Sequence, residues 1–120
     1  MDFPKQEITL YHKDTKNKAY IRYSLIASVR DTSIQNRTRT GESSTDKALI
    51  RIFASDNNPS TYQVQNGDLI VNRNVNDNIS YEKGLTELRG LYGEENTYKI
   101  NTIDKFIFGE ELDHIKLGAV

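Results

Sequence analysis

The feature that most constrains the fold is an alternation of side-chain character along residues 19–31. One set of alternating positions is apolar and consists of Ile21, Tyr23, Leu25, Ala27 and Val29. The positions between them are polar, with Ile26 as the exception. Successive side chains of a β-strand point to opposite faces, so this period of two predicts a half-buried strand of an antiparallel sheet.

Shorter segments carry weaker strand patterns. They are residues 8–11, 47–54, 61–65, 68–72, 98–103 and 114–119. Apolar residues fall on both faces of 47–54, which favours a central strand. Asn66-Gly67 lies between 61–65 and 68–72, and this dipeptide predicts a tight hairpin that pairs those two segments.

A helical spacing of apolar residues interrupts the strand patterns once. The residues concerned are Leu85, Leu88, Leu91 and Tyr92, and Gly93 follows at the position of a helix C-cap. We expect a two-turn helix lying over one opening of a barrel. The predicted class is therefore mainly β: a small antiparallel β-barrel or sandwich with one short helix and a long polar inter-strand loop.

The chain length of 120 residues fits one domain with one core. Hydrophobic residues make up 36% and charged residues 28%, which suits a small core under much polar surface, or a subunit that completes its core against neighbours. We expect a single β-barrel-like domain over residues 1–120. Residues 1–6 are expected to form a loose arm, because Pro4 disfavours regular strand pairing.

Residues 32–46 are predicted to form a long flexible loop, because Ile34 is their only aliphatic residue. Loops of this length in small domains are usually functional or disordered. The candidate channel or partner residues in it are Ser33, Gln35, Asn36, Arg37, Arg39, Thr40 and Glu42. Arg37 and Arg39 are the candidates for contact with nucleic-acid phosphate.

No catalytic or metal-binding pattern stands out. The absence of cysteine excludes disulfides, thiolate metal sites and a cysteine nucleophile. His12 and His114 are isolated in the sequence, and each is expected to be at the surface or partly packed. The Glu110-Glu111 and Asp113 cluster is expected to be a solvated turn. We therefore expect no enzyme activity, no metal and no cofactor.

Charge and hydropathy limit the classes of partner that the sequence favours. The net charge of −1 gives no global attraction to nucleic acid or to an anionic membrane. No apolar run reaches the roughly 20 residues of a membrane span, and residues 1–6 lack a signal-peptide pattern, so synthesis in the cytosol is expected. Aromatic and basic residues do share strand faces, at Tyr20 with Arg22 and at Phe53 with Arg51. These pairs leave open a single-stranded nucleic-acid-binding barrel.

Four short motifs together resemble a family. They are Gly67-Asp68-Leu69-Ile70-Val71, then Leu88-Arg89-Gly90-Leu91-Tyr92-Gly93, then Tyr98-Lys99-Ile100-Asn101-Thr102-Ile103-Asp104, and last Gly109 with Asp113-His114-Ile115-Lys116-Leu117-Gly118-Ala119. Their order resembles that of small head–tail connector proteins of tailed phages and prophages of Gram-positive bacteria, called minor capsid, head-closure or stopper proteins. The resemblance covers the C-terminal half in detail and the rest in layout.

The resemblance implies a non-enzymatic virion structural protein at the head–tail junction, made in the bacterial host cytoplasm. It implies a small β-barrel with a short helix, assembled as a homo-oligomeric ring around the DNA channel. The partners would be an adjacent portal or adaptor protein, tail proteins and, non-specifically, phage DNA. The loop with Arg37 and Arg39 would then face the channel or the next ring. The alternative is a tail-terminator or tail-completion subunit, which would also assemble as a ring.

Overall fold

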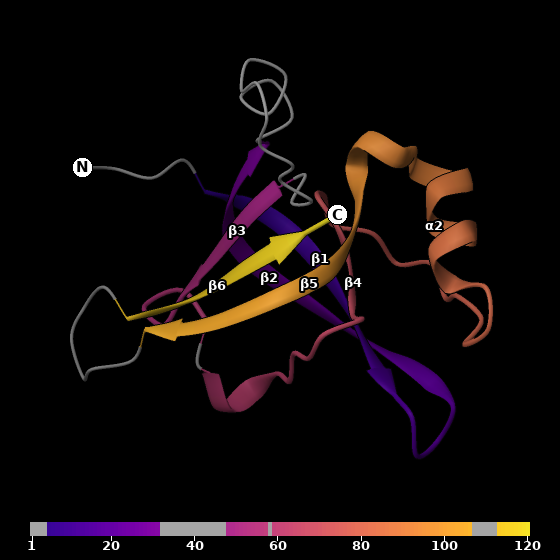
Figure 1. The fold of residues 1–120 in the computed structure, drawn as a ribbon, viewed down its shortest axis with the longest axis horizontal. Helices are drawn as coiled ribbons and strands as arrows, with labels where there is room; N and C mark the ends of the chain where they lie inside the picture. The colour runs from indigo at the N-terminus through magenta and orange to yellow at the C-terminus, as the bar shows by residue number, and fades with distance from the viewer. Residues whose placement is uncertain (1–4, 32–47, 58, 107–112) are drawn as a thin grey trace, which may run out of the picture.

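A computed structural model describes residues 5–31, 48–57, 59–106 and 113–120. In these residues the strands close into an antiparallel barrel in the order β1-β2-β3-β6-β5-β4 (Figure 1). The strands are β1 (Gln6–Asp14), β2 (Ala19–Asp31), β3 (Ala48–Phe53), β4 (Leu69–Val71), β5 (Thr97–Phe106) and β6 (His114–Ala119). One α-helix, α2 (Gly84–Tyr92), and the short 3-10 turns η1 (Pro59–Thr61) and η2 (Glu94–Asn96) complete these segments. The predicted class, a small antiparallel barrel with one short helix, is confirmed.

The alternation along β2 places its apolar residues as predicted. Leu25 and Ala27 are buried in the barrel, while Arg22 and Ser24 on the opposite face are exposed. Ile21 departs from the prediction, since 39% of it is exposed. The reason is its position: β3 pairs with β2 only from Ser28 onward, so Ile21 lies beyond the closed wall.

The core has two parts, one on each face of the sheet. The barrel interior holds Ile8, Leu10, Ile50, Ile100 and Leu117, among others. A second cluster lies on the outer face and joins strand residues Tyr11, Leu69 and Val71 to Val75 and Leu88. Both faces of β1 and β4 are therefore covered, which explains why all three residues of β4 are buried.

The helix prediction is confirmed in extent and wrong in placement. Leu88 is fully buried in the outer cluster, so α2 packs against the outside of the wall formed by β4 and β5 and does not lie over an opening. Gly93 follows the helix with φ of 92°, a conformation that glycine adopts without strain, and its N–H donates to the carbonyl of Arg89.

The predicted hairpin of residues 61–65 with 68–72 is wrong. Residues 62–65 form no strand, and β4 pairs with β1 and β5 instead. The Asn66-Gly67 turn does exist, with φ of 93° at Gly67, whereas Asn66 is not among the residues with positive φ. A tight type I′ hairpin needs positive φ at both positions. Here the N–H of Gly67 instead donates to the carbonyl of Ile100, which directs the chain to β5.

The remaining boundaries differ in smaller ways. The predicted strand over residues 8–11 is longer, as β1, and takes in Gln6 from the expected loose arm. The predicted strands over 19–31 and 114–119 match β2 and β6. The predicted strand over 98–103 is also longer, because β5 runs from Thr97 to Phe106. Tyr98 and Ile100 are buried, but Thr102, the next alternate residue, is exposed because the ladder is irregular between Ile100 and Thr102.

Candidate functional site

The predicted partner loop lies outside the described residues. This applies to residues 32–46 and therefore to Ser33, Gln35, Asn36, Arg37, Arg39, Thr40 and Glu42. Their assignment stays a prediction. The sites that can be built from geometry lie instead around Asp68, at the turn that precedes β4.

Asp68 is the centre of a buried polar network that joins three parts of the chain. The residue is fully buried, and its carboxylate lies 2.9 Å from Nδ1 of His12. It also accepts the backbone N–H groups of Lys13 and Gln65, both at 2.8 Å. The side chain of Gln65 donates in turn to the carbonyl of Lys13. A buried carboxylate needs such donors to offset the loss of its hydration.

His12 is thus a correction to the sequence prediction. It is 7% exposed and paired with Asp68, not at the surface or partly packed. Its partner lies 56 residues away, so no local pattern could reveal the pair. Asp113, expected in a solvated turn, is likewise buried, at 7% exposure. His114 is half-buried and its ring packs against that of Phe53.

Two pockets flank the Asp68 turn. The side chains of neighbouring strand residues point to opposite faces, so His12 and Lys13 line different pockets. The pocket beside His12 has a volume of about 340 Å³ and is also lined by Tyr62, Gln63 and Lys105. The pocket beside Lys13 has a volume of about 180 Å³ and reaches the start of α2.

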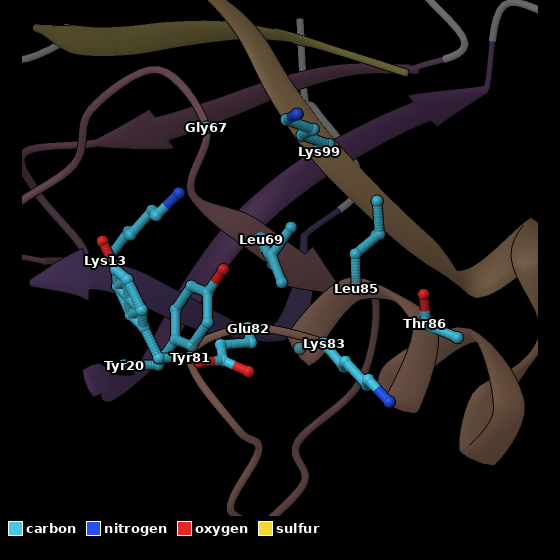
Figure 2. A pocket seen from close by; sticks show the side chains of 11 residues that line it. Lys13, Tyr20, Gly67, Leu69, Tyr81, Glu82, Lys83, Leu85, Thr86 and Lys99 are labelled. Atoms are coloured by element: carbon cyan, nitrogen blue, oxygen red, sulfur yellow. The ribbon is translucent and has the colours of Figure 1, made fainter. Parts of the chain in front are cut away.

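The smaller pocket combines basic and aromatic side chains. Figure 2 shows the rings of Tyr20 and Tyr81 near Lys13, with Lys99 across the pocket on β5. The Lys13 ammonium lies 5.2 Å from the centroid of the Tyr81 ring, within cation–π range. Burial raises the pKa of the Tyr20 hydroxyl, and the neighbouring Tyr81 and Asp68 raise it further. Glu82 also lines this pocket, so its wall carries both signs of charge.

The two predicted pairs of aromatic and basic residues, Phe53 with Arg51 and Tyr20 with Arg22, differ in how exposed they are. Phe53 is 3% exposed, and the Lys5 ammonium lies 5.1 Å from its ring centroid, so that ring offers no face to a base. Arg22 is exposed, and its Nη1 donates to the carbonyl of Asn76 and to Oδ1 of Asn78. The stacking platform expected of a single-strand binder is therefore missing at Phe53.

The described residues hold neither a metal-binding cluster nor a helix that could span a membrane. Those residues contain no group of three or more His, Asp or Glu side chains arranged to hold a metal ion. None of the helices in the described part of the chain has the length and apolarity to cross a bilayer.

The fold and this polar turn define a class: a closed six-stranded antiparallel barrel with an outer helix and a buried His–Asp pair at the turn before β4. A family model matches residues 3–120, nearly the whole chain, and the protein belongs to that family, described as a family of unknown function (DUF6751). Comparison with curated proteins and with solved structures finds no match.

Proposed function

We propose that this protein is a non-enzymatic structural subunit of a tailed-phage or prophage virion. It forms a head-closure or connector ring at the head–tail junction, after synthesis in the host cytoplasm. The support is where the connector-like motifs fall. Three of them coincide with β4, β5 and β6, which are neighbours in the barrel, and the fourth forms the C-terminal half of α2 against that wall. Motifs separated in sequence thus make one contiguous surface.

The distribution of exposed apolar side chains also supports a ring. Ile26 on β2 is 41% exposed, and Leu91 on α2 is 58% exposed. In the closed order β2 and β5 are three strands apart, and α2 packs on the side of β4 and β5. Ring subunits join through two different patches, one from each neighbour. Apolar residues on opposite sides of the barrel provide the two patches that such a head-to-tail contact needs.

In this proposal the adjacent portal or adaptor protein and the tail proteins are the other partners. The loop of residues 32–46 faces the channel or the next ring, with Arg37 and Arg39 nearest the phage DNA. That assignment rests on the sequence, since the loop lies outside the described residues.

The test is the location of the protein and the effect of its loss. Mass spectrometry of gradient-purified particles from the source phage or induced prophage should detect it in stoichiometric amounts. Deletion of its gene should leave heads that lose their packaged DNA and carry no tails, alongside free tails of normal length. Its absence from particles would overturn the proposal. Heads that retain DNA alongside tails of irregular length would assign it to the tail end, as a terminator or completion subunit, and would also contradict head closure.

Surface variants sharpen this test. Ile26→Asp and Leu91→Asp place a charge in each candidate ring contact, and both positions are exposed, so folding should be retained. Each should fail to complement the deletion. Thr86→Asp, at another exposed position of α2, is the matched control and should complement. Complementation by both Ile26→Asp and Leu91→Asp would rule out these residues as the contacts.

A further inference from the structure

The β1–β2 hairpin is longer than the barrel that contains it. All nine residues of β1 pair with residues 19–27 of β2, and the hairpin extends beyond the wall (Figure 1). On its other side β2 pairs with β3 only from Ser28 to Asp31. Residues 19–27 of β2 therefore present a strand edge that no other described strand covers.

Asn57 marks where this edge begins. Its side-chain amide donates to the carbonyl of Ile26 at 2.7 Å, and its Oδ1 accepts the N–H of Ile26 at 3.3 Å. The amide thus takes the place of a paired strand at Ile26, two residues beyond the end of the β2–β3 pairing at Ser28. It also fixes the direction of the backbone groups: at Ile26 they point away from β1. Residues of the same parity, Ser24, Arg22 and Tyr20, direct theirs the same way.

The opposite edge of the hairpin is closed by equivalent means. There, Lys13 lies two residues beyond the end of the β1–β4 pairing at Tyr11. Its N–H donates to Asp68 and its carbonyl accepts from Gln65. Within the described segments, the edge of β2 has a single closure, at Ile26. For Tyr20, Arg22 and Ser24, the described residues supply no hydrogen-bond partner to the outward backbone groups. Arg22 and Ser24 are also exposed.

The side chains along this edge define what would pair with it. A strand added beside β2 would have one face against Ile21 and Tyr23, where Ile21 is 39% exposed. Its other face would lie against Arg22. The hairpin is basic for a chain of net charge −1: residues 13–22 hold Lys13, Lys16, Lys18 and Arg22 with a single carboxylate, Asp14. The Asp14 carboxylate is engaged by the N–H groups of Lys16 and Asn17.

We propose that the β2 edge from Tyr20 to Ser24 binds an extended segment of a partner protein by strand addition. The segment alternates apolar residues, which pack against Ile21 and Tyr23, with acidic residues, which face Arg22. Five residues of strand span about 17 Å, so the segment is short. The proposal does not depend on the phage assignment.

A second copy of this chain is a poorer occupant. In antiparallel pairing of two such edges, Arg22 of one copy lies opposite or next to Arg22 of the other. The two lysine-rich turns add further positive charge on both sides. Like charges directly opposite one another destabilise a strand pair. Charge complementarity therefore favours an acidic partner segment.

The probe is an eight-residue, terminally blocked peptide of alternating valine and glutamate, with the valine–lysine peptide as the control. Amide hydrogen exchange is followed by NMR on the full chain. At saturation the amides of Tyr20, Arg22 and Ser24 should exchange at least about tenfold more slowly, because strand addition pairs them. The amides of Ile21 and Tyr23 should change little, because they already face β1. The lysine peptide should have no effect.

Two substitutions test the edge itself. Ser24→Pro removes an outward N–H that pairs with nothing in the barrel, a position at which an edge strand tolerates proline. It should weaken glutamate-peptide binding at least about tenfold, since it both deletes a donor and blocks approach. Ser24→Ala keeps the N–H and should bind as the unmodified chain does. Asn57→Ala frees the groups of Ile26, lengthens the edge and should tighten binding.

Outcomes that overturn the proposal are distinct. The first is equal binding of the glutamate and lysine peptides. The second is equal protection of all amides from residue 20 to 24, without the alternation between outward and β1-facing amides. The third is equal peptide binding by Ser24→Pro and Ser24→Ala. Should Ser24→Pro fail to fold, glutamate peptides N-methylated at one parity or the other replace it, and only one parity should abolish binding. Protection of the same amides that rises with protein concentration in the absence of peptide would identify a second copy as the occupant and refute the acidic segment.

Discussion

Replacing Asp68 by alanine should remove the polar contacts that hold the β1–β2 hairpin to β4. The carboxylate is fully buried and accepts hydrogen bonds from His12, Lys13 and Gln65. After Asp68→Ala all three donors lose their acceptor at once. The side chain of Gln65 would still bond the carbonyl of Lys13, so the hairpin keeps one of its attachments.

The magnitude follows from the number of donors left without a partner. A buried donor without an acceptor costs about 1–3 kcal/mol. His12 lines an open pocket, so water can reach its ring and reduce its share. The hydrogen bonds donated by the N–H groups of Lys13 and Gln65 are part-buried, so water can reduce their shares as well. We therefore expect Asp68→Ala to lower the free energy of unfolding by about 4 kcal/mol. That is a large part of the about 5–15 kcal/mol typical of a small domain.

Urea unfolding followed by circular dichroism measures this loss, with the midpoint interpreted at constant slope. Asp14→Ala is the matched control, because Asp14 also accepts three hydrogen bonds, but on an exposed turn. Its effect should be much smaller, since water replaces those bonds. The reasoning is refuted if Asp68→Ala unfolds within about 1 kcal/mol of the unmodified chain, or if both variants lose equal stability.

Three further predictions test other parts of the molecule. Gly84→Ala should destabilise the fold by about 1–3 kcal/mol, because the added Cβ would lie 2.8 Å from Cε2 of Tyr20. Gly90→Ala should stabilise the helix by about 0.5–1 kcal/mol, because no atom lies within 4 Å of its added Cβ. Thermal melts that rank the two variants in the other order would contradict this. Leu88→Ala should lower the free energy of unfolding by about 2–5 kcal/mol, because the Leu88 side chain is fully buried. Leu91→Ala should lower it by under about 0.5 kcal/mol, because Leu91 is 58% exposed. Equal unfolding midpoints for the two variants would disprove this. Burial raises the pKa of Tyr62 to about 12 from 10.0, so its contribution to stability is complete below pH 10 and is lost as pH rises towards 12. Urea midpoints from pH 9 to 12 should fall less for Tyr62→Phe than for the unmodified chain, and parallel curves would rule this out.

The sequence predicts the strands whose patterns are local. β2 and β6 match their predicted ranges because alternation of side chains reports directly which face is buried. The Asn66-Gly67 signal misleads, because a turn signal shows where the chain bends and not which strand it then joins. The N–H of Gly67 bonding to Ile100 decides that question, and this contact is between residues far apart in sequence.

The site shows the same limit more strongly. The sequence interpretation treats His12 as an ordinary histidine and Asp68 as part of a strand motif. Their pairing arises only when β4 is placed beside β1. Likewise, the outer cluster forms because residues 72–83 fold back over β1, with the Tyr11 hydroxyl donating to the carbonyl of Asp77 and Thr9 bonding to Arg73. Residues 72–83 carry no periodic pattern, so nothing in the sequence predicts that they cover a sheet face.

Side chains, and not additional strands, end the pairing on both edges of the β1–β2 hairpin. Gln65 and Asp68 close the edge at Lys13, and Asn57 closes the other at Ile26. An exposed strand edge invites unwanted pairing, and soluble proteins usually block it. The two closures differ in strength, since the first includes a fully buried carboxylate and the second a single amide near the surface. If both served only to prevent association, blocking groups would be expected along the rest of β2 as well. For the edge from Tyr20 to Ser24, the part of the chain that the structure describes supplies no such groups, and Arg22 lies on this edge. That is the arrangement that a specific acidic strand would require.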